Sequence, residues 1–201
     1  IKIAFMNIEI LVALLIFGFV ASVTPGPNNL MLMSSGANYG VRRSLPHVFG
    51  ITGGFILMVV LVGLGLMRIF EQYPISFEIL RGFSIVYLSY LAWKIATSGN
   101  VGTREGGKPL TSLQAAMFQW VNPKAWAFAL SALTLYAPSQ SLGAVALVAL
   151  ILGGVNLPSI FVWVVLGQNL QRILQKPGRM KVFNLVMAMM LVATLYPILF
   201  A

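Results

Sequence analysis

Apolar residues run along this chain in long stretches that short polar or glycine-rich segments separate. Six of these stretches approach or exceed the roughly 20 residues that a helix needs to cross a bilayer. They cover residues 8–24, 46–67, 75–97, 111–136, 141–167 and 181–200, and the first continues as a shorter helix to about residue 37. The pattern predicts an all-α membrane protein with six transmembrane helices.

Composition agrees with a chain that lipid surrounds. Of the 201 residues, 59% are hydrophobic and only 8% are charged, whereas soluble domains carry roughly 25% charged residues. The chain has no cysteine, no aspartate and one histidine, which excludes thiol–disulfide chemistry and argues against a metal site. We therefore expect no catalytic residues, no metal and no cofactor, and a protein that is not an enzyme.

The basic residues predict how the helices are oriented. Those in the connections after the first, third and fifth stretches outnumber, nine to three, those in the N-terminal segment and the other connections, and cytoplasmic loops carry the excess of Lys and Arg. Both termini are therefore predicted to lie outside the cytoplasm. The net charge of +9 follows from this topology, so no nucleic-acid partner is expected. The nine are Arg42, Arg43, Lys94, Arg104, Lys108, Arg172, Lys176, Arg179 and Lys181.

A polar, glycine-rich segment at residues 98–112 divides the chain into two halves. It is typical of a flexible cytoplasmic linker between a first three-helix repeat at 1–97 and a second at 113–201. Because three crossings precede the linker, the second half enters the membrane from the opposite side. That arrangement predicts a 3+3 inverted repeat within one membrane domain, with helices 1 and 4 broken.

The first stretch is interrupted by two prolines around a glycine. Prolines remove N–H donors and free carbonyl oxygens, which inside a bilayer must face protein or a water-filled cavity. A short helix restarting after the break would present N–H groups suited to a carboxylate; a plain proline kink capped by the asparagines is the alternative. Because the stretch leads directly into this motif, we predict a membrane helix rather than a cleaved signal peptide. The motif is Thr24-Pro25-Gly26-Pro27-Asn28-Asn29.

The fourth stretch carries a second interruption, at Asn122-Pro123. Lys124 follows it, and a charge at membrane depth costs at least about 2.5 kcal/mol and usually faces a cavity or a partner. We predict that Lys124 faces a cavity, near a bound carboxylate; pairing with a glutamate and snorkelling are the alternatives. Gln119 and Asn156 could line the same cavity, although Asn156 could equally join two helices. His47, beside Pro46, is predicted at the membrane interface.

At these motifs the chain resembles the LysE/RhtB family of amino-acid exporters over nearly its whole length. The family's proline-glycine-proline segment corresponds to Pro25, Gly26 and Pro27, and its span-four motif to residues 122–124. Residues 24–29 and 91–98 are most similar to the branch that exports cysteine and O-acetylserine. The resemblance implies a secondary transporter of the bacterial inner membrane, an antiporter driven by protons that exports small amino acids or their derivatives.

One departure from the family bears on the substrate. Many members carry an aspartate directly after the second proline, where this chain has Asn28. A cationic substrate would lack that counter-charge, so the resemblance implies neutral substrates such as cysteine, O-acetylserine, threonine or homoserine. Export of lysine or arginine, and a packing subunit without transport, are the alternatives. Expected partners are the amino acid, protons and membrane lipid, and the sequence leaves open whether the chain forms a homodimer.

The candidate substrate-binding residues come from both interruptions and from the fifth stretch. They are Thr24, Pro25, Gly26, Pro27, Asn28, Asn29, Gln119, Asn122, Pro123, Lys124 and Asn156.

Overall fold

The structure is a computed structural model that describes residues 6–98, 108–137, 139–174, 176 and 178–196. Within these residues the chain is helical and has no strand. Part of the predicted linker and residues 197–200 of the sixth stretch lie outside them. The elements are α1 (Ile8–Val23), α2 (Pro27–Leu61), the π-helical turn η1 (Val62–Leu66), α3 (Met67–Gln72), α4 (Pro74–Ala96), α5 (Ser112–Phe118), the 3-10 turn η2 (Gln119–Val121), α6 (Pro123–Tyr136), α7 (Leu142–Leu174) and α8 (Arg179–Ala193).

Helix α2 consists of two helices that meet at Gly40. The φ of Gly40 is 79° and its ψ is 168°, a conformation that glycine adopts without the steric cost of a side chain. The second half begins with Val41, whose N–H donates to Oε1 of Gln168 at 2.6 Å. The sequence predicted a helix that ended near residue 37 and a new one from Pro46. That prediction is wrong in detail, because Gly40 turns the chain in one residue and Pro46 lies inside the second half.

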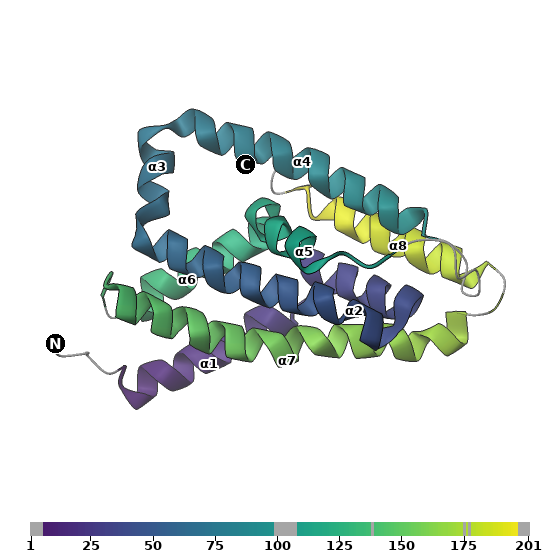
Figure 1. Cartoon of the computed structure of the whole chain (residues 1–201), viewed down its shortest axis with the longest axis horizontal. Helices are drawn as coiled ribbons and strands as arrows, with labels where there is room; N and C mark the ends of the chain where they lie inside the picture. The colour runs from purple at the N-terminus through teal and green to yellow at the C-terminus, as the bar shows by residue number, and fades with distance from the viewer. Residues whose placement is uncertain (1–5, 99–107, 138, 175, 177, 197–201) are drawn as a thin grey trace.

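The helices pack around a central pair. Helix α2 packs most extensively against α7, and α4 packs against α8; Figure 1 shows α4 and α8 side by side along one edge of the molecule. One buried cluster joins α2, α4, α5, α7 and α8. A second joins α1, α2, α6 and α7, so α2 and α7 belong to both.

Helices α2 and α7 cross in close contact at two glycines. A Cβ atom built on Gly36 would lie 2.1 Å from the carbonyl oxygen of Val164, and one built on Gly167 would lie 2.0 Å from the carbonyl oxygen of Met33. No other residue fits at either position without moving a backbone. The two helices therefore touch backbone to backbone at this point.

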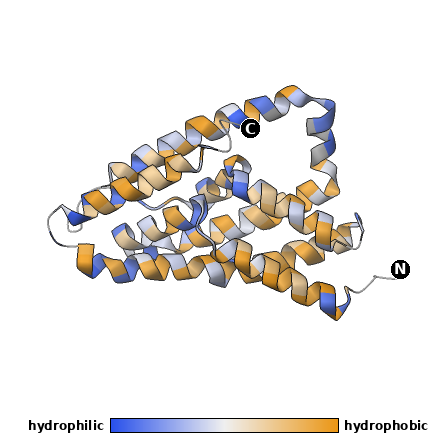
Figure 2. Ribbon diagram, turned by 180° about the vertical axis from the view of Figure 1, so that it is seen from behind, coloured by the Kyte–Doolittle hydropathy of each residue, from blue (hydrophilic) through white to orange (hydrophobic). Residues whose placement is uncertain are grey.

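The outer surface is apolar, as expected for a chain in lipid. Large hydrophobic side chains are exposed on most helices, Val86 and Leu113 among them, and Figure 2 shows hydrophobic residues along the helices with hydrophilic ones toward several helix ends. Three helical stretches, Pro27–Leu66, Pro74–Ala96 and Leu142–Leu174, are long and apolar enough to cross a bilayer. The chain is an all-helical membrane protein.

Candidate functional site

The first interruption lies between α1 and α2. Helix α1 ends at Val23, Thr24 has extended backbone angles, and Gly26 is extended with a φ of −173°. Pro27 then takes the first position of α2, where its missing N–H costs no helical bond. Since the next residues supply no helical N–H groups in register, the last carbonyl oxygens of α1 need other donors.

Asn29 and Trp163 supply two of these donors. The side-chain amide of Asn29, which is only 3% exposed, donates to the carbonyl oxygen of Ser22 at 2.9 Å and to that of Thr24 at 2.7 Å. The indole N–H of Trp163, on α7, donates to the carbonyl oxygen of Val23 at 3.2 Å. Asn29 therefore folds back onto the helix that precedes it, and the break is held by the protein itself.

Lys124, which follows the second interruption, supplies a third donor to the oxygens of the first. Its ammonium group donates to the carbonyl oxygen of Thr24 at 2.7 Å, to the Thr24 hydroxyl at 2.8 Å and to the carbonyl oxygen of Pro25 at 3.3 Å. Lys124 is half-buried, whereas Thr24 and Pro25 are exposed. A cation at this position also lies at the negative end of the α1 dipole.

The second interruption has its own local cap. Asn122 is extended, between η2 and α6, and its side-chain oxygen accepts the backbone N–H of Lys124 at 3.2 Å. Pro123 takes the first position of α6, as Pro27 does in α2. The indole N–H of Trp126 donates to the carbonyl oxygen of Trp120 at 2.9 Å across the break. Both interruptions therefore have the same design, an extended residue followed by a proline that starts the next helix.

A pair of amides joins the two interruptions directly. Asn28 donates to Oε1 of Gln119 at 2.9 Å, and Gln119 donates back to Oδ1 of Asn28 at 3.1 Å. Gln119 is fully buried and also donates to the carbonyl oxygen of Ala115 at 2.9 Å. The reciprocal pair fixes both amide orientations and links residues 91 positions apart.

A small cavity lies where the two interruptions meet. Its volume is about 30 Å³, enough for one or two water molecules, so it has to widen before an amino acid can enter. The stacked rings of Phe55 and Phe128, with centroids 4.8 Å apart, form an apolar part of its wall. None of the described residues that line it is acidic. They are Ala21, Ser22, Gly26, Asn28, Asn29, Phe55, Asn122, Lys124, Ala125, Phe128, Asn156 and Ile160.

Asn156 belongs to this cavity through α7. Its amide nitrogen donates to the hydroxyl of Ser22 at 3.1 Å, and its oxygen accepts the hydroxyl of Thr52 at 3.4 Å. It is 5% exposed. It lines the cavity, and its two hydrogen bonds join α7 to α1 and α2. The two readings of Asn156 that the sequence left open are compatible.

The structure thus brings the candidate residues of both interruptions together. Six of them line the cavity, namely Gly26, Asn28, Asn29, Asn122, Lys124 and Asn156. Thr24 and Pro25 contact the Lys124 ammonium, Gln119 pairs with Asn28, and Pro27 and Pro123 begin the helices after the breaks. Sequence reasoning missed Ser22 and Trp163, because a serine and a tryptophan in apolar stretches carry no signal of their own.

No metal cluster accompanies this site. Among the described residues, no three His, Cys, Asp or Glu side chains come together as metal ligands would. What the geometry offers is a set of carbonyl oxygens, amides and one ammonium, which are groups that bind and orient a polar solute.

Two interrupted helices that meet at a polar cavity inside an apolar helical bundle define an integral membrane protein of the transporter class. Residues 19–195 match the family of LysE type translocators. The chain belongs to this family and is therefore a transporter and not an enzyme.

The sequence is similar to those of named proteins over nearly its full length. The sequence is 29% identical over 192 residues to proteins named cysteine/O-acetylserine efflux protein from Escherichia coli (strain K12), Shigella sonnei (strain Ss046) and Escherichia coli O9:H4 (strain HS). In each case the match covers 93% of this chain and 96% of the relative. No solved structure matches the chain.

Proposed function

We propose that the chain is a secondary transporter that exports small neutral amino acids or their derivatives, of the cysteine and O-acetylserine kind, in exchange for protons. The family supports amino-acid export, and the names of the relatives support this substrate class. The observation that carries the proposal is the set of hydrogen bonds from the Lys124 ammonium to the oxygens of Thr24 and Pro25 in the first interruption.

These hydrogen bonds support a specific way for an amino acid to bind. The oxygens of Thr24 and Pro25 already hold one primary ammonium, at 2.7–3.3 Å, so they are suited to the α-ammonium of a substrate. When the substrate takes these oxygens, the Lys124 ammonium is released toward the substrate carboxylate. A zwitterion thus replaces one ion–dipole contact by an ion–dipole contact and an ion pair, which is a role for Lys124 beyond the carboxylate contact that the sequence predicted.

The same geometry favours neutral over basic substrates. None of the described cavity-lining residues is acidic, and Lys124 already contributes a positive charge. A second cationic group, as on lysine, would be repelled by about 1–4 kcal/mol at 4 Å for an effective dielectric between 80 and 20. Neutral side chains incur no such cost.

The architecture proposed for this function is a 3+3 inverted repeat, 1–97 and 113–201, joined by the cytoplasmic linker 98–112, with both termini outside. The three long apolar helices supply three crossings. The shorter α1 and α8, and the interrupted α5–α6 pair over residues 112–136, supply the other three. The matching design of the two interruptions, and their direct contact through Lys124, support this arrangement.

Counterflow in liposomes tests the proposal. The purified chain is reconstituted into liposomes loaded with unlabelled O-acetylserine, and uptake of labelled O-acetylserine is followed with protein-free liposomes as the control. We expect accumulation that cysteine and O-acetylserine inhibit and that lysine inhibits weakly. Absence of counterflow would refute transport of this substrate class, and stronger inhibition by lysine would refute the account of the cavity.

A further inference from the structure

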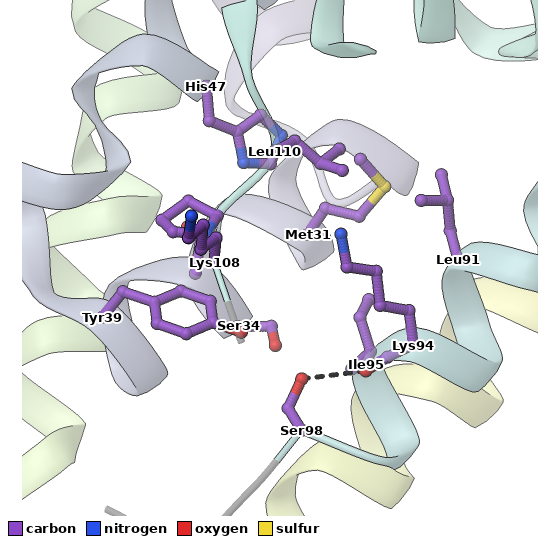
Figure 3. A pocket seen from close by; sticks show the side chains of 12 residues that line it. Met31, Ser34, Tyr39, His47, Leu91, Lys94, Ile95, Ser98, Lys108 and Leu110 are labelled. Atoms are coloured by element: carbon purple, nitrogen blue, oxygen red, sulfur yellow. Dashed lines mark hydrogen bonds between the residues drawn. The ribbon is translucent and has the colours of Figure 1, made fainter. Parts of the chain in front are cut away.

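A second pocket lies apart from the cavity between the interruptions and shares no lining residue with it. Its volume is about 40 Å³. Its wall comes from both halves of α2, from the last turns of α4 and from the segment that leads into α5. The polar residues that matter here are Ser34, Tyr39, His47, Lys94, Ser98 and Lys108, and Figure 3 shows them around one space.

His47 is the unusual member of this pocket. It is only 2% exposed, so it is buried inside the protein, and its place at the level of the membrane interface stays a prediction. Neither ring nitrogen has a hydrogen-bond partner among the described residues, although buried polar groups almost always have one. Burial without a partner is costly, and because the ring faces the pocket, a ligand there can supply the missing partner.

The charges around His47 define what that ligand is. Lys94 and Lys108 bring two ammonium groups to the same wall, and Figure 3 shows the Lys94 side chain extending from α4 into the pocket that His47 faces from α2. Within the described part of the chain, neither lysine forms an ion pair, and no acidic residue lines the pocket. Two neighbouring cations with no carboxylate favour a bound anion.

We propose that this pocket binds a small oxyanion, a carboxylate or phosphate group, between the ammonium groups of Lys94 and Lys108 and the ring N–H of His47. Charge-assisted hydrogen bonds to oxyanions are the strong class of such contacts. A volume of about 40 Å³ corresponds to about two water molecules, which is room for a carboxylate group. The hydroxyls of Ser34 and Tyr39 lie in the same wall for any further polar group of the ligand.

The source of the oxyanion is either the carboxylate of an amino acid or the phosphate of an anionic lipid. If it is the amino acid, the pocket collects substrate from the cytoplasm, because Lys94, in the last turn of α4, and Lys108, before α5, flank the linker that the charge distribution predicts to be cytoplasmic. That role rests on the proposed function. The binding of an oxyanion does not, and it can be measured without transport.

The chain contains a single histidine, so the imidazole nitrogens of His47 give an unambiguous NMR signal in protein labelled at histidine. The labelled full chain is placed in nanodiscs of neutral phosphatidylcholine at constant pH and ionic strength, and it is titrated with acetate, O-acetylserine or phosphate against chloride. We expect a saturable shift with the oxyanions and none with chloride. Lys94→Met and Lys108→Met should each weaken the apparent affinity for acetate roughly fivefold or more. Lys181→Met, which removes an exposed lysine outside the pocket, should leave it unchanged.

The lipid source is tested by replacing part of the phosphatidylcholine with phosphatidylglycerol. A shift of the His47 signal before any acetate is added assigns the oxyanion to lipid, whereas saturation by O-acetylserine in neutral lipid assigns it to the substrate. No saturable shift with any oxyanion, or equal shifts in the two pocket variants and the unmodified chain, would overturn the proposal. If the His47 signal shifts with oxyanions but the chain shows no counterflow, the proposed function is refuted and this site stands. If the chain shows counterflow but the His47 signal does not shift, this site is refuted and the proposed function stands.

Discussion

Lys124→Met is the sharpest test of the contact between the Lys124 ammonium and the first interruption. The substitution keeps an unbranched apolar side chain and removes the ammonium with its contacts at 2.7, 2.8 and 3.3 Å. Thr24 keeps the amide of Asn29 at 2.7 Å as a second donor to its carbonyl oxygen. The loss of hydrogen bonds therefore costs about 1–3 kcal/mol of stability, less than the roughly 5–15 kcal/mol that folded domains have, so we expect the chain to fold.

We expect Lys124→Met to lower transport efficiency more than it lowers the stability of the fold. If the released ammonium pairs with the substrate carboxylate at about 4 Å, its removal costs about 1–4 kcal/mol for an effective dielectric between 80 and 20. That range corresponds to a fall in transport efficiency between about fivefold and several hundredfold. Counterflow rates at increasing O-acetylserine concentration measure it, with Lys181→Met as the control for loss of one lysine. Lys124→Arg keeps the charge but not the compact ammonium, and it should give an intermediate rate. A Lys124→Met chain that transports as fast as the unmodified chain would refute this role of Lys124.

Three further substitutions, the last with a control, test the surroundings of the site and the crossing of α2 and α7. Asn28→Asp adds a carboxylate beside the cavity and should make lysine a stronger inhibitor of counterflow; unchanged inhibition would contradict the charge argument. Asn29→Leu keeps the size of the side chain but removes the two hydrogen bonds that the Asn29 amide donates to Ser22 and Thr24. The apparent unfolding midpoint in detergent should therefore drop by the equivalent of about 2–4 kcal/mol, and an unchanged midpoint would show that these bonds contribute little. Gly36→Ala places a Cβ 2.1 Å from the carbonyl oxygen of Val164 and should cost about 3 kcal/mol, whereas Gly53→Ala, where a Cβ would have nothing within 4 Å, should be neutral or slightly stabilising.

The interruptions could be predicted from sequence because proline acts locally. In both motifs an extended residue stands directly before a proline that can start a new helix, and the structure places both breaks there. A lone proline does not suffice, since Pro46 and Pro158 lie inside α2 and α7. The donors that fill the breaks could not be predicted. Trp163 lies 140 residues from the carbonyl it binds and Lys124 lies 100 residues from Thr24, so only the tertiary fold makes them partners.

The early start of the second helix and the burial of His47 have the same origin. A helix was expected to begin at Pro46 because the second apolar stretch begins there, but the turn at Gly40 precedes it, and Gln168 of another helix caps the new start at Val41. The helix that starts at Val41 directs His47 inward, against α4 and the segment before α5. The basic residues next to His47 in the sequence do not reveal these contacts, because the tertiary fold makes them.

The glycine crossing of α2 and α7 has a mechanical consequence. Where Gly36 and Gly167 meet, backbone lies against backbone and no layer of side chains is present to rearrange. Sliding one helix along the other would drive carbonyl groups into neighbouring Cα atoms, while a change in crossing angle keeps this contact nearly fixed. We therefore expect the crossing to act as a pivot: in a transport cycle that changes the angle between α2 and α7, this contact would stay in place while the ends of the helices move furthest.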